Sequence, residues 1–542
     1  MEHSALHALL LCGLTVACGG VTVACGGVLA IWWLLRPAAR LSTVAITRAL
    51  FVSVERLVMI GALAAALATA GDFFVQAAEI ENQTVFGGVD LSLVLRFITV
   101  TTVGQLNLTR GILLLLAATA VRFLPGAWKW SITGLLAFGA LVATAFVSHA
   151  AAQPEGRAVF IGCQMAHLAA VAAWMGVLLH LFVARRHLLT PEAAPLLAEI
   201  VRRFSPFALA TTSLLALTGL LAAGRFLQSF GALFTSAYGL TLLVKLTLLA
   251  PALAAGFINY RVIRPALRAA SGDRLPVLRR FGRTLELEVT AGILVITVAG
   301  ILGSVSPPGE DGSLRLTSRQ TQALLTPHWP TSHVDNWMAA DDPRGPTLDD
   351  LHYSEFTHNW SGVIVTLLGI GWMVQASGGR LSLWAGRINP FLLLPFGGFV
   401  AMLANPELWL LHYVSPWEAI TNPQILEHQI GAALVFVLAW LSWRDLRQPA
   451  TLRPLGYPLP VIMIVGSLLL LGHAHSTPAV SDELTNLINV QHAVLGACGL
   501  FAGTVRWFVL RDLIRGRWAN LLWPAWIIVL GLFMAFVYRE AV

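Results

Sequence analysis

Charge is scarce in this sequence of 542 residues. Only 12% of the residues are Asp, Glu, Lys or Arg, 57% are hydrophobic, and the mean hydropathy is +0.73. This composition excludes an ordinary soluble protein. Most of the chain is therefore expected to face lipid.

Cysteine is also scarce, and all five cysteines fall inside apolar runs: Cys12, Cys18, Cys25, Cys163 and Cys498. A disulfide framework of the secreted type is therefore excluded. Cys18 and Cys25 belong to a tandem TVACGG repeat and, being seven residues apart, share a helix face. We interpret the repeat as small-residue helix packing, with metal binding as the alternative.

Several motifs of known chemistry are missing. The sequence has no Walker or other phosphate loop, no H-E-x-x-H and no nucleophile, base and acid trio. Direct coupling to ATP and enzymatic activity are therefore not expected. Methionine is limited to nine residues, with no Met-rich tract of the kind that captures Cu(I). Capture of metal by histidine suits Cu(II) or Zn(II) as well as Cu(I).

Apolar runs long enough to cross a bilayer recur along the whole chain. They predict an all-α polytopic membrane bundle of about fourteen transmembrane helices. Eight lie in a block at 1–304 and six in a block at 358–542, with a periplasmic linker or cap at 305–357. The first run could be read as a signal peptide, but a helix is preferred because no cleavage site stands out. The predicted spans are 8–35, 50–71, 107–124, 130–150, 158–183, 205–223, 239–260, 286–304, 360–376, 391–412, 429–443, 457–473, 490–509 and 520–538.

The loops between these spans divide into two sets of different charge. One set carries 26 of the 35 Lys and Arg residues against six acids, whereas the other carries eight Arg and twenty acids. The positive-inside rule assigns the first set to the cytoplasm and both termini to the periplasm. The net charge of +7 is then a topological signature, so the expected partner is the lipid bilayer and not nucleic acid.

Histidines gather on the predicted outer side. Thirteen of the fifteen lie there: His3, His7, His149, His167, His328, His333, His352, His358, His412, His428, His473, His475 and His492. Only His180 and His187 lie inward. Histidines inside membrane spans are candidates for function, although a single one is often a packing residue.

Two outer groups of candidate metal ligands emerge. In the first block, Cys163 and His167 share a helix face, Met165 lies between them, and a short loop is expected to bring His149 nearby. Imidazole with thiolate or thioether suits copper, Cu(I) especially. Lys245, in the outer third of its span, is expected either to pair with an acid such as Asp72 or to snorkel outward.

In the second block, five histidines are predicted at one membrane depth and could converge on a metal. His473 and His475 can share a metal only where the helix has ended, as the following Ser476-Thr-Pro478 suggests. His352 and His412 are weaker candidates. The five candidate ligands are His358, His428, His473, His475 and His492.

The first block resembles the copper resistance D (CopD) family of bacterial inner-membrane proteins. The resemblance rests on short motifs in a fixed order, and it departs from the family where Val177 replaces a second glycine. The motifs are Ser148-His149-Ala150, His167 with Trp174-Met175-Gly176, Phe204-Ser205, Thr218-Gly219, and Thr235-x-x-Tyr238-Gly239 followed by Lys245 and Asn259.

The second block resembles the C-terminal extension of long members of that family. The motifs are Glu355-x-x-His358-x-Trp360, Asn405-Pro406-Glu407-x-Trp409, Glu427-His428, His473-x-His475 and His492 with Gly496. The resemblance implies copper handling at the periplasmic face, with uptake into the cytoplasm and a small periplasmic copper-binding partner.

Two other functions fit the same residues. Paired histidines on neighbouring helices are what b-type haem requires, so a haem-binding electron-transfer protein or metalloreductase is one alternative. A copper sensor or assembly factor that does not transport, and that docks a chaperone through 305–357, is the other.

Overall fold

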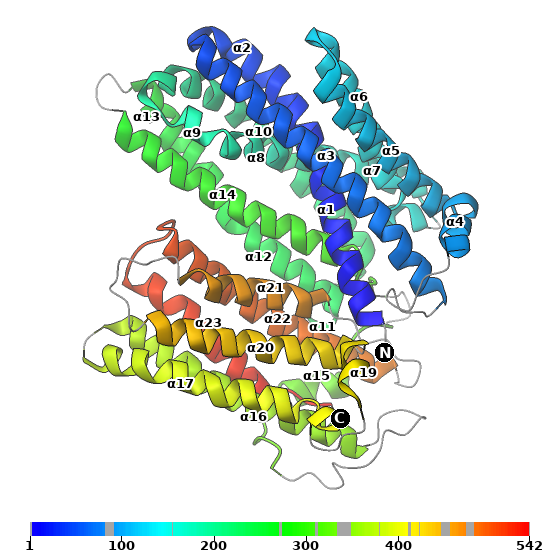
Figure 1. Cartoon of the computed structure of the whole chain (residues 1–542), viewed down its shortest axis with the longest axis vertical. Helices are drawn as coiled ribbons and strands as arrows, with labels where there is room; N and C mark the ends of the chain where they lie inside the picture. Colours follow the sequence, from blue (N-terminus) through cyan, green and yellow to red (C-terminus); the bar gives the residue numbers. More distant parts are fainter. Residues whose placement is uncertain are drawn as a thin grey trace. The chain divides into compact units, whose positions relative to one another are not determined.

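The computed structural model of the chain is all-helical in the part that it describes. No strand occurs there (Figure 1). The all-α class predicted from composition is thereby confirmed. The described residues are 3–81, 91–153, 155–269, 274–308, 313–332, 348–378, 380–409, 414–421, 423–445, 456–472 and 482–540.

Twelve helical segments in the described residues are long and apolar enough to cross a membrane. They are Thr15–Leu41, Val44–Ala77, Thr102–Phe123, Gly126–Phe146, Arg157–Val183, Pro191–Leu227, Ala237–Ala269, Leu275–Leu302, Leu348–Ser377, Arg380–Leu403, Glu483–Leu510 and Arg517–Phe536. The two remaining predicted spans correspond to α20 (Pro423–Asp445) and to the shorter apolar helix α21 (Pro458–Gly472). The chain is a multi-pass membrane protein, whereas the count of fourteen and the periplasmic termini stay predictions.

Several helices extend well beyond the apolar runs. The run at 205–223 belongs to α10 (Ala194–Leu227), and the run at 286–304 belongs to α14 (Leu275–Leu302). In α10 the extension carries Glu199, which pairs with Arg202 and Arg203 at helical spacing. Such pairs stabilise a helix in water. An apolar run therefore marks the part of a helix inside the membrane and not its ends.

Residues Leu9–Gln228 and Leu242–Ser304 form one compact unit, which we name unit 2. Within it, α3 and α6 both pack against α5, and α7 packs against α6 and α10. The helices with residues in this unit are α1 (His3–Leu29), α2 (Arg36–Ala38), α3 (Val44–Glu81), α4 (Leu91–Val100), α5 (Thr102–Phe123), α6 (Gly126–Phe146), α7 (Arg157–Val171), α8 (Val177–Val183), α9 (Arg185–Leu188), α10, α12 (Ala237–Ile258), α13 (Arg264–Ala269) and α14.

Shorter turns of other helix types interrupt unit 2. The π-helical turns are η1 (Ala30–Leu35), η5 (Ala172–Gly176) and η7 (Asn259–Ile263). The 3-10 turns are η2 (Ala39–Leu41), η4 (His149–Ala152) and η6 (Pro191–Ala193). The π-helical turns η5 and η7 continue α7 and α12 directly, so each of these long membrane segments contains a local change of helical register.

Glycines of the TVACGG repeat bring helices of unit 2 into close contact. A Cβ added to Gly20 would lie 2.3 Å from the carbonyl oxygen of Gly61 on α3, and one added to Gly26 would lie 2.4 Å from the Cα of Gly176. Only glycine permits these distances, so the interpretation of the repeat as small-residue packing is confirmed. Gly176 makes this close approach although Val177 replaces the second glycine of the family motif.

Residues Met1–Ala8, Ser229–Thr241 and Val305–Val542 form the other compact unit, unit 1. In it α16 packs against α17 and α23, α17 against α20, and α22 against α21 and α23. Its helices are α11 (Ala232–Thr235), α15 (Ser318–Leu324), α16 (Leu348–Ser377), α17 (Arg380–Leu403), α18 (Pro406–Trp409), α19 (Pro416–Thr421), α20, α21, α22 (Asp482–Leu510) and α23 (Arg517–Phe536).

The segment predicted as a linker groups with the second block. Leu316 N donates a hydrogen bond to the carbonyl oxygen of Thr235 at 2.8 Å, which ties two segments of unit 1 together. Thr317 and Gln320 form a capping box at the start of α15. Because α16 begins at Leu348, the last part of 305–357 is helical.

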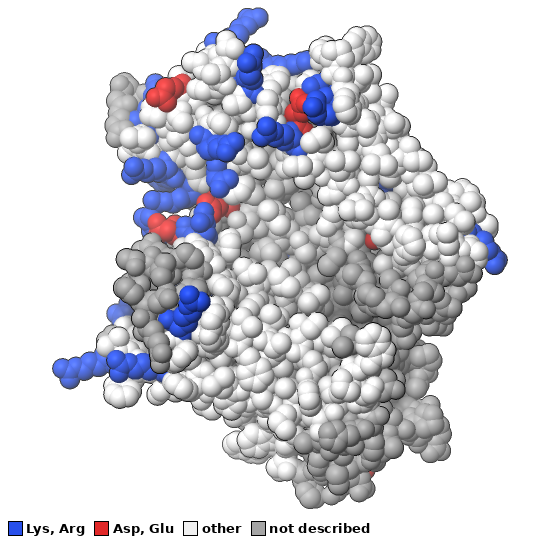
Figure 2. All heavy atoms as spheres, viewed as in Figure 1, with Lys and Arg blue, Asp and Glu red and all other residues white. Residues whose placement is uncertain are grey.

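Basic side chains gather at one end of unit 2. Lys and Arg residues cover the end formed by α2, α9 and α13 (Figure 2). These helices belong to the loops that the charge count assigns to the cytoplasm. The charge difference counted in the sequence therefore corresponds to one end of the folded bundle.

Candidate metal centres

Two candidate ligands on α7 converge on one residue of α10. The Sγ atom of Cys163 lies 3.6 Å from the carbonyl oxygen of Thr218, and Nδ1 of His167 lies 2.8 Å from Thr218 Oγ1. Because Cys163 and His167 are four residues apart, they share one face of α7. The structure thus brings the predicted thiol and imidazole together beside Thr218.

Thr218 determines which nitrogen of His167 is left for a metal. Its hydroxyl donates to the carbonyl oxygen of Leu214 at 2.7 Å, so Oγ1 acts as the acceptor toward His167. His167 Nδ1 then carries the proton, and Nε2 keeps its lone pair. A Cβ on Gly219 would lie 3.8 Å from His167 Cε1, so Gly219 borders the same ring. The Thr218-Gly219 motif therefore orients His167.

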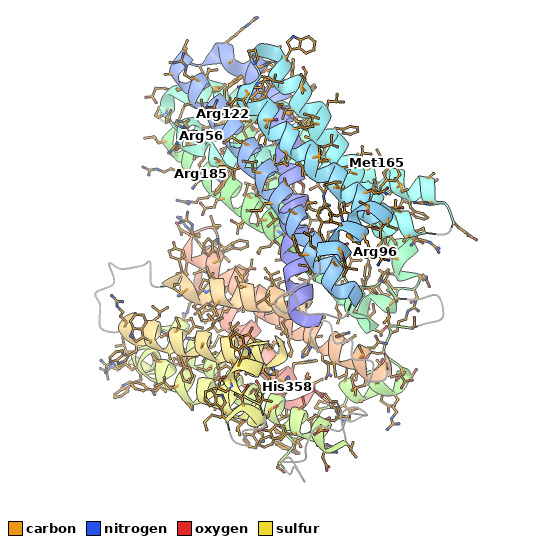
Figure 3. All side chains as sticks on the ribbon, turned by 45° about the vertical axis from the view of Figure 1, so that its right-hand side comes forward. Arg56, Arg96, Arg122, Met165, Arg185 and His358 are labelled. Carbon is orange, nitrogen blue, oxygen red and sulfur yellow. The ribbon has the colours of Figure 1, made fainter. Side chains whose placement is uncertain are left out.

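Met165 lies on a different side of α7. It is two residues from both Cys163 and His167, which corresponds to about 200° around a helix. In Figure 3 it lies away from the end of unit 2 that carries Arg56, Arg122 and Arg185. The three sulfur and nitrogen ligands predicted on α7 therefore do not point to one place.

The buried charges of unit 2 pair differently from the expectation. Asp72 and Arg110 lie 3.8 Å apart and are 4% and 2% exposed, and Arg110 also donates to Thr69 Oγ1. Asp72 thus pairs with Arg110 and not with Lys245. Lys245 interacts electrostatically with His167, so its amine lies near the Cys163 and His167 pair.

His149 lies in η4, which packs against α7 and therefore close in the fold to the helix of Cys163 and His167. Burial lowers the pKa of His149 below its ordinary value, and a hydrogen bond with the Gly303 backbone opposes part of this effect. The ring also contacts Phe226 edge-on, and its Nε2 is buried without a hydrogen-bond partner. His149 therefore presents a neutral, unused nitrogen, which is the form that binds a metal.

In unit 1, two predicted ligands lie beside a tyrosine. The ring centroids of His358 on α16 and His492 on α22 are 6.3 Å apart, and Tyr538 stacks on His358 at 4.2 Å. When two imidazoles bind the same metal through nitrogens that lie roughly 2 Å from it, their ring centroids are about 5 to 6 Å apart. His358 and His492 are therefore close to the separation that a shared metal requires.

Carboxylates surround this histidine pair. Tyr538 and Ser354 both donate to Glu540 Oε1, at 2.7 and 2.6 Å, and the Glu540 backbone N–H donates to Glu355 at 2.7 Å. Burial, with the charges of Glu540 and Glu355, raises the pKa of Tyr538 well above its usual range, so the phenol stays protonated.

The same network orients His358. Its Nδ1 lies 2.8 Å from the Ser354 carbonyl oxygen, to which it donates, so Nε2 keeps its lone pair. The backbone of α16 therefore prepares His358 for a metal in the way that Thr218 prepares His167.

Of the other predicted histidines, His352 and His328 adjoin the network around His358, and His428 has a different partner. His428 Nδ1 lies 3.1 Å from Asn405 Oδ1, and His352 lies 3.8 Å from Glu355. His328 lies 3.2 Å from the carbonyl oxygen of Tyr538. His333, His412, His473 and His475 lie outside the described residues, as do the side chains of His3 and His7. Convergence of five imidazoles therefore stays a prediction.

No group of three or more His, Cys, Asp or Glu side chains suited to a metal ion occurs among the described residues. The observed candidate centres are therefore pairs: Cys163 with His167, and His358 with His492. A thiol with an imidazole is a ligand pair that suits Cu(I).

Tyr538 and Glu540 were not predicted from the sequence. They follow α23 in a short polar tail, where nothing in their spacing indicates that the tail packs beside His358. The one available signal was the pair of polar residues directly after the last apolar run. Thr218 was noticed only as part of a motif, and its hydrogen bond to His167 gives it a physical role.

Comparison with known proteins gives matches that concern copper. The family model "Copper resistance protein D" matches residues 198–302, and the model "Copper resistance protein D-like, N-terminal domain" matches residues 6–159. Cys163 and His167 lie between the two matched ranges. The resemblance predicted for the first block is confirmed.

The chain is 32% identical over 181 residues to "Copper transport protein CutJ" of Bacillus subtilis (strain 168). The match covers 33% of this chain and 31% of that protein, so the two share about a third of their lengths. No solved structure matches the chain.

Proposed function

Because this chain belongs to the copper resistance protein D family, we propose that it captures copper at the periplasmic face of the bacterial inner membrane and carries it across. The observation that carries the proposal is the convergence of Cys163 and His167 on Thr218 inside a membrane bundle. Thiolate and imidazole together are a ligand pair for Cu(I). Copper here is the cargo, and no catalytic step is part of the proposal.

Each unit has a distinct role in this proposal. His358 and His492 of unit 1 take up copper first, together with the predicted ligands His428, His473 and His475. His149, Cys163 and His167 of unit 2 then hold copper on the way into the bilayer. A small periplasmic copper-binding protein is the proposed donor. The name of the related Bacillus subtilis protein, a copper transport protein, supports a role in copper transport.

Haem binding by His149 and His167 is the alternative to copper binding by these residues. His167 uses Nδ1 for Thr218, so only its Nε2 is left for any axial bond. The matched families concern copper resistance, and no finding here favours haem. Copper is therefore the preferred cargo.

Metal and haem analysis of the purified protein tests the proposal before any mutagenesis. We expect bound copper by elemental analysis and no Soret band in the optical spectrum. Reconstituted vesicles should then accumulate copper, and His167→Ala with Cys163→Ser should abolish accumulation. His187→Ala, which changes a histidine on α9 beside Arg186, is the matched control and should transport normally. A Soret band abolished by His149→Ala or His167→Ala would contradict the proposal.

A further inference from the structure

One buried carboxylate of unit 2 has neutral partners. Glu288 lies midway along α14 and is 3% exposed. Its Oε1 accepts a hydrogen bond from Trp174 Nε1 at 3.1 Å, and its Oε2 accepts one from Asn259 Nδ2 at 3.1 Å. Thr284 donates to the Oδ1 atom of the same Asn259 at 2.5 Å, which fixes the amide. An ionised Glu288 would thus keep a net negative charge inside the bilayer.

No ionisable side chain of the described residues pairs with Glu288. His180 Nε2 lies 2.9 Å from the carbonyl oxygen of Val23 instead. The other ionisable groups on α14 and on the elements near this part of it are His180 on α8, Lys245 on α12, Tyr260 and Arg261 on η7, and Arg279, Arg280, Arg283 and Glu286 on α14 itself. Their positions leave the carboxylate with two neutral donors.

Asp72 shows that the fold can neutralise a buried acid when its role is structural. The Asp72 carboxylate lies 3.8 Å from the Arg110 guanidinium, and both side chains are almost fully buried. Glu288 is equally buried and has no such partner. An unpaired acid at this depth is costly unless it binds a cation or a proton.

The two donors to Glu288 come from irregular helix. Trp174 lies within the π-helical turn η5, and Asn259 is the first residue of the π-helical turn η7. Such turns are uncommon and often mark functional sites, because they re-aim side chains that a regular helix would place elsewhere. Gly256 adds room, since a Cβ there would lie 3.2 Å from Glu288 Oε1. Two independent backbone distortions thus serve the same carboxylate.

The site lies deeper than the proposed copper ligands. Trp174 follows His167 by seven residues along α7 and η5, a rise of about 10 Å. A cation that leaves His167 toward the other end of the bundle would therefore come near Glu288. If the Glu288 carboxylate binds a proton before that step and releases it when the cation arrives, the net charge in this part of the bilayer stays constant.

We propose that Glu288 is a proton-exchange site that couples proton movement to copper passage through unit 2. An O–H bond forms at one carboxylate oxygen when the proton binds and breaks when copper enters, and no atom changes oxidation state. The proton is exchanged with water. The coupling rests on the transport proposed above, whereas proton binding by Glu288 does not.

Infrared difference spectroscopy of the full chain tests proton binding directly. Raising the pH from about 5 to about 9 should remove a protonated-carboxyl C=O band in the wild type. Glu288→Gln should lack this band, whereas Glu286→Gln on the same helix should keep it. Glu288→Asp retains a carboxyl group and should also show a titrating band, which separates loss of the group from misfolding. Persistence of the band in Glu288→Gln, or its absence from the wild type, overturns the proposal.

Copper uptake into vesicles tests the coupling. We expect wild-type uptake to respond about tenfold or more to an imposed pH gradient, and Glu288→Gln to lose that response while still binding copper. An equal response in the two proteins overturns the coupling. If the wild type takes up no copper at all, the proposed transport fails, and the infrared band still decides whether Glu288 exchanges a proton.

Discussion

The histidines of the two candidate copper centres have different neighbouring residues. In unit 2, His167 shares Thr218 with a thiol and interacts electrostatically with Lys245. In unit 1, His358 lies against Tyr538 and His492, with Glu355 and Glu540 joined through the same network. A soft pair favours Cu(I), whereas imidazoles among carboxylates accept Cu(II) as well. The difference fits capture by unit 1 and movement through unit 2.

The largest expected effect comes from removing the soft pair. Cys163→Ser with His167→Ala should weaken Cu(I) binding by more than about a hundredfold, because both the thiol and the imidazole of the pair are removed. Cu(II) binding by unit 1 should be unchanged. Competition against a Cu(I) chelator, with copper stoichiometry measured in parallel, checks both statements. Equal losses of Cu(I) and Cu(II) binding would remove the distinction between the two centres.

The second expected effect is loss of the group that orients His167. Thr218→Val keeps the shape but removes the acceptor for His167 Nδ1, and should weaken Cu(I) binding by about 10 to 100-fold. Thr212→Val changes the same residue type on α10, where Thr212 bonds only to its own helix backbone, and serves as the control. The same chelator competition measures the change. Unaltered affinity in Thr218→Val would show that the ring needs no such support.

A smaller effect is expected in unit 1. Tyr538→Phe keeps the ring stacked on His358 but removes the hydrogen bond to Glu540, which should lower Cu(II) affinity by roughly 2 to 10-fold. Cu(I) binding by unit 2 should not change. Isothermal titration with Cu(II), compared with Tyr457→Phe as a tyrosine elsewhere in unit 1, provides the measurement. A change in Cu(I) binding alone would contradict the assignment.

The smallest effect concerns pH. Burial lowers the pKa of folded His149 below its ordinary value of 6.5, so the unfolded chain takes up a proton at higher pH than the folded chain does. Stability contributed by neutral His149 is therefore present above pH 6.5 and is lost as the pH falls below it. Thermal unfolding followed across this range should show a smaller pH dependence in His149→Gln. A larger pH dependence of thermal unfolding in His149→Gln than in the wild type would contradict this prediction.

The sequence predicted the membrane bundle well because each span is a long local signal. Composition alone placed the helices, and the loops around α2, α9 and α13 carried enough Arg to identify one end of unit 2. The ends of the helices were harder to predict from the sequence. The extension of α14 back to Leu275 depends on polar turns that resemble loops in hydropathy. Glu288, near the start of the predicted apolar run 286–304, consequently lies in the middle of α14.

The sequence could assign two ligands to one pair only where they share a helix, whereas His358 and His492 were predicted only as members of a larger group. Cys163 and His167 could be paired because four residues are about one turn, and the structure brings both to Thr218. The contact between Tyr538 and His358 joins residues 180 positions apart in the numbering, and no spacing rule reaches that far. The pairing of Asp72 with Arg110 in place of Lys245 has the same cause: charge indicates that a partner is needed but not which helix supplies it.

By itself, the sequence determined that the chain is a multi-pass helical membrane protein, because burial in lipid is a property of each segment alone. Which histidines meet one another, and which carboxylate lacks a cation, was decided by tertiary structure. Those properties depend on helix rotation and on irregular turns such as η5 and η7. The contacts between these side chains are stabilised by close packing at glycines and by hydrogen bonds between segments that are distant in sequence.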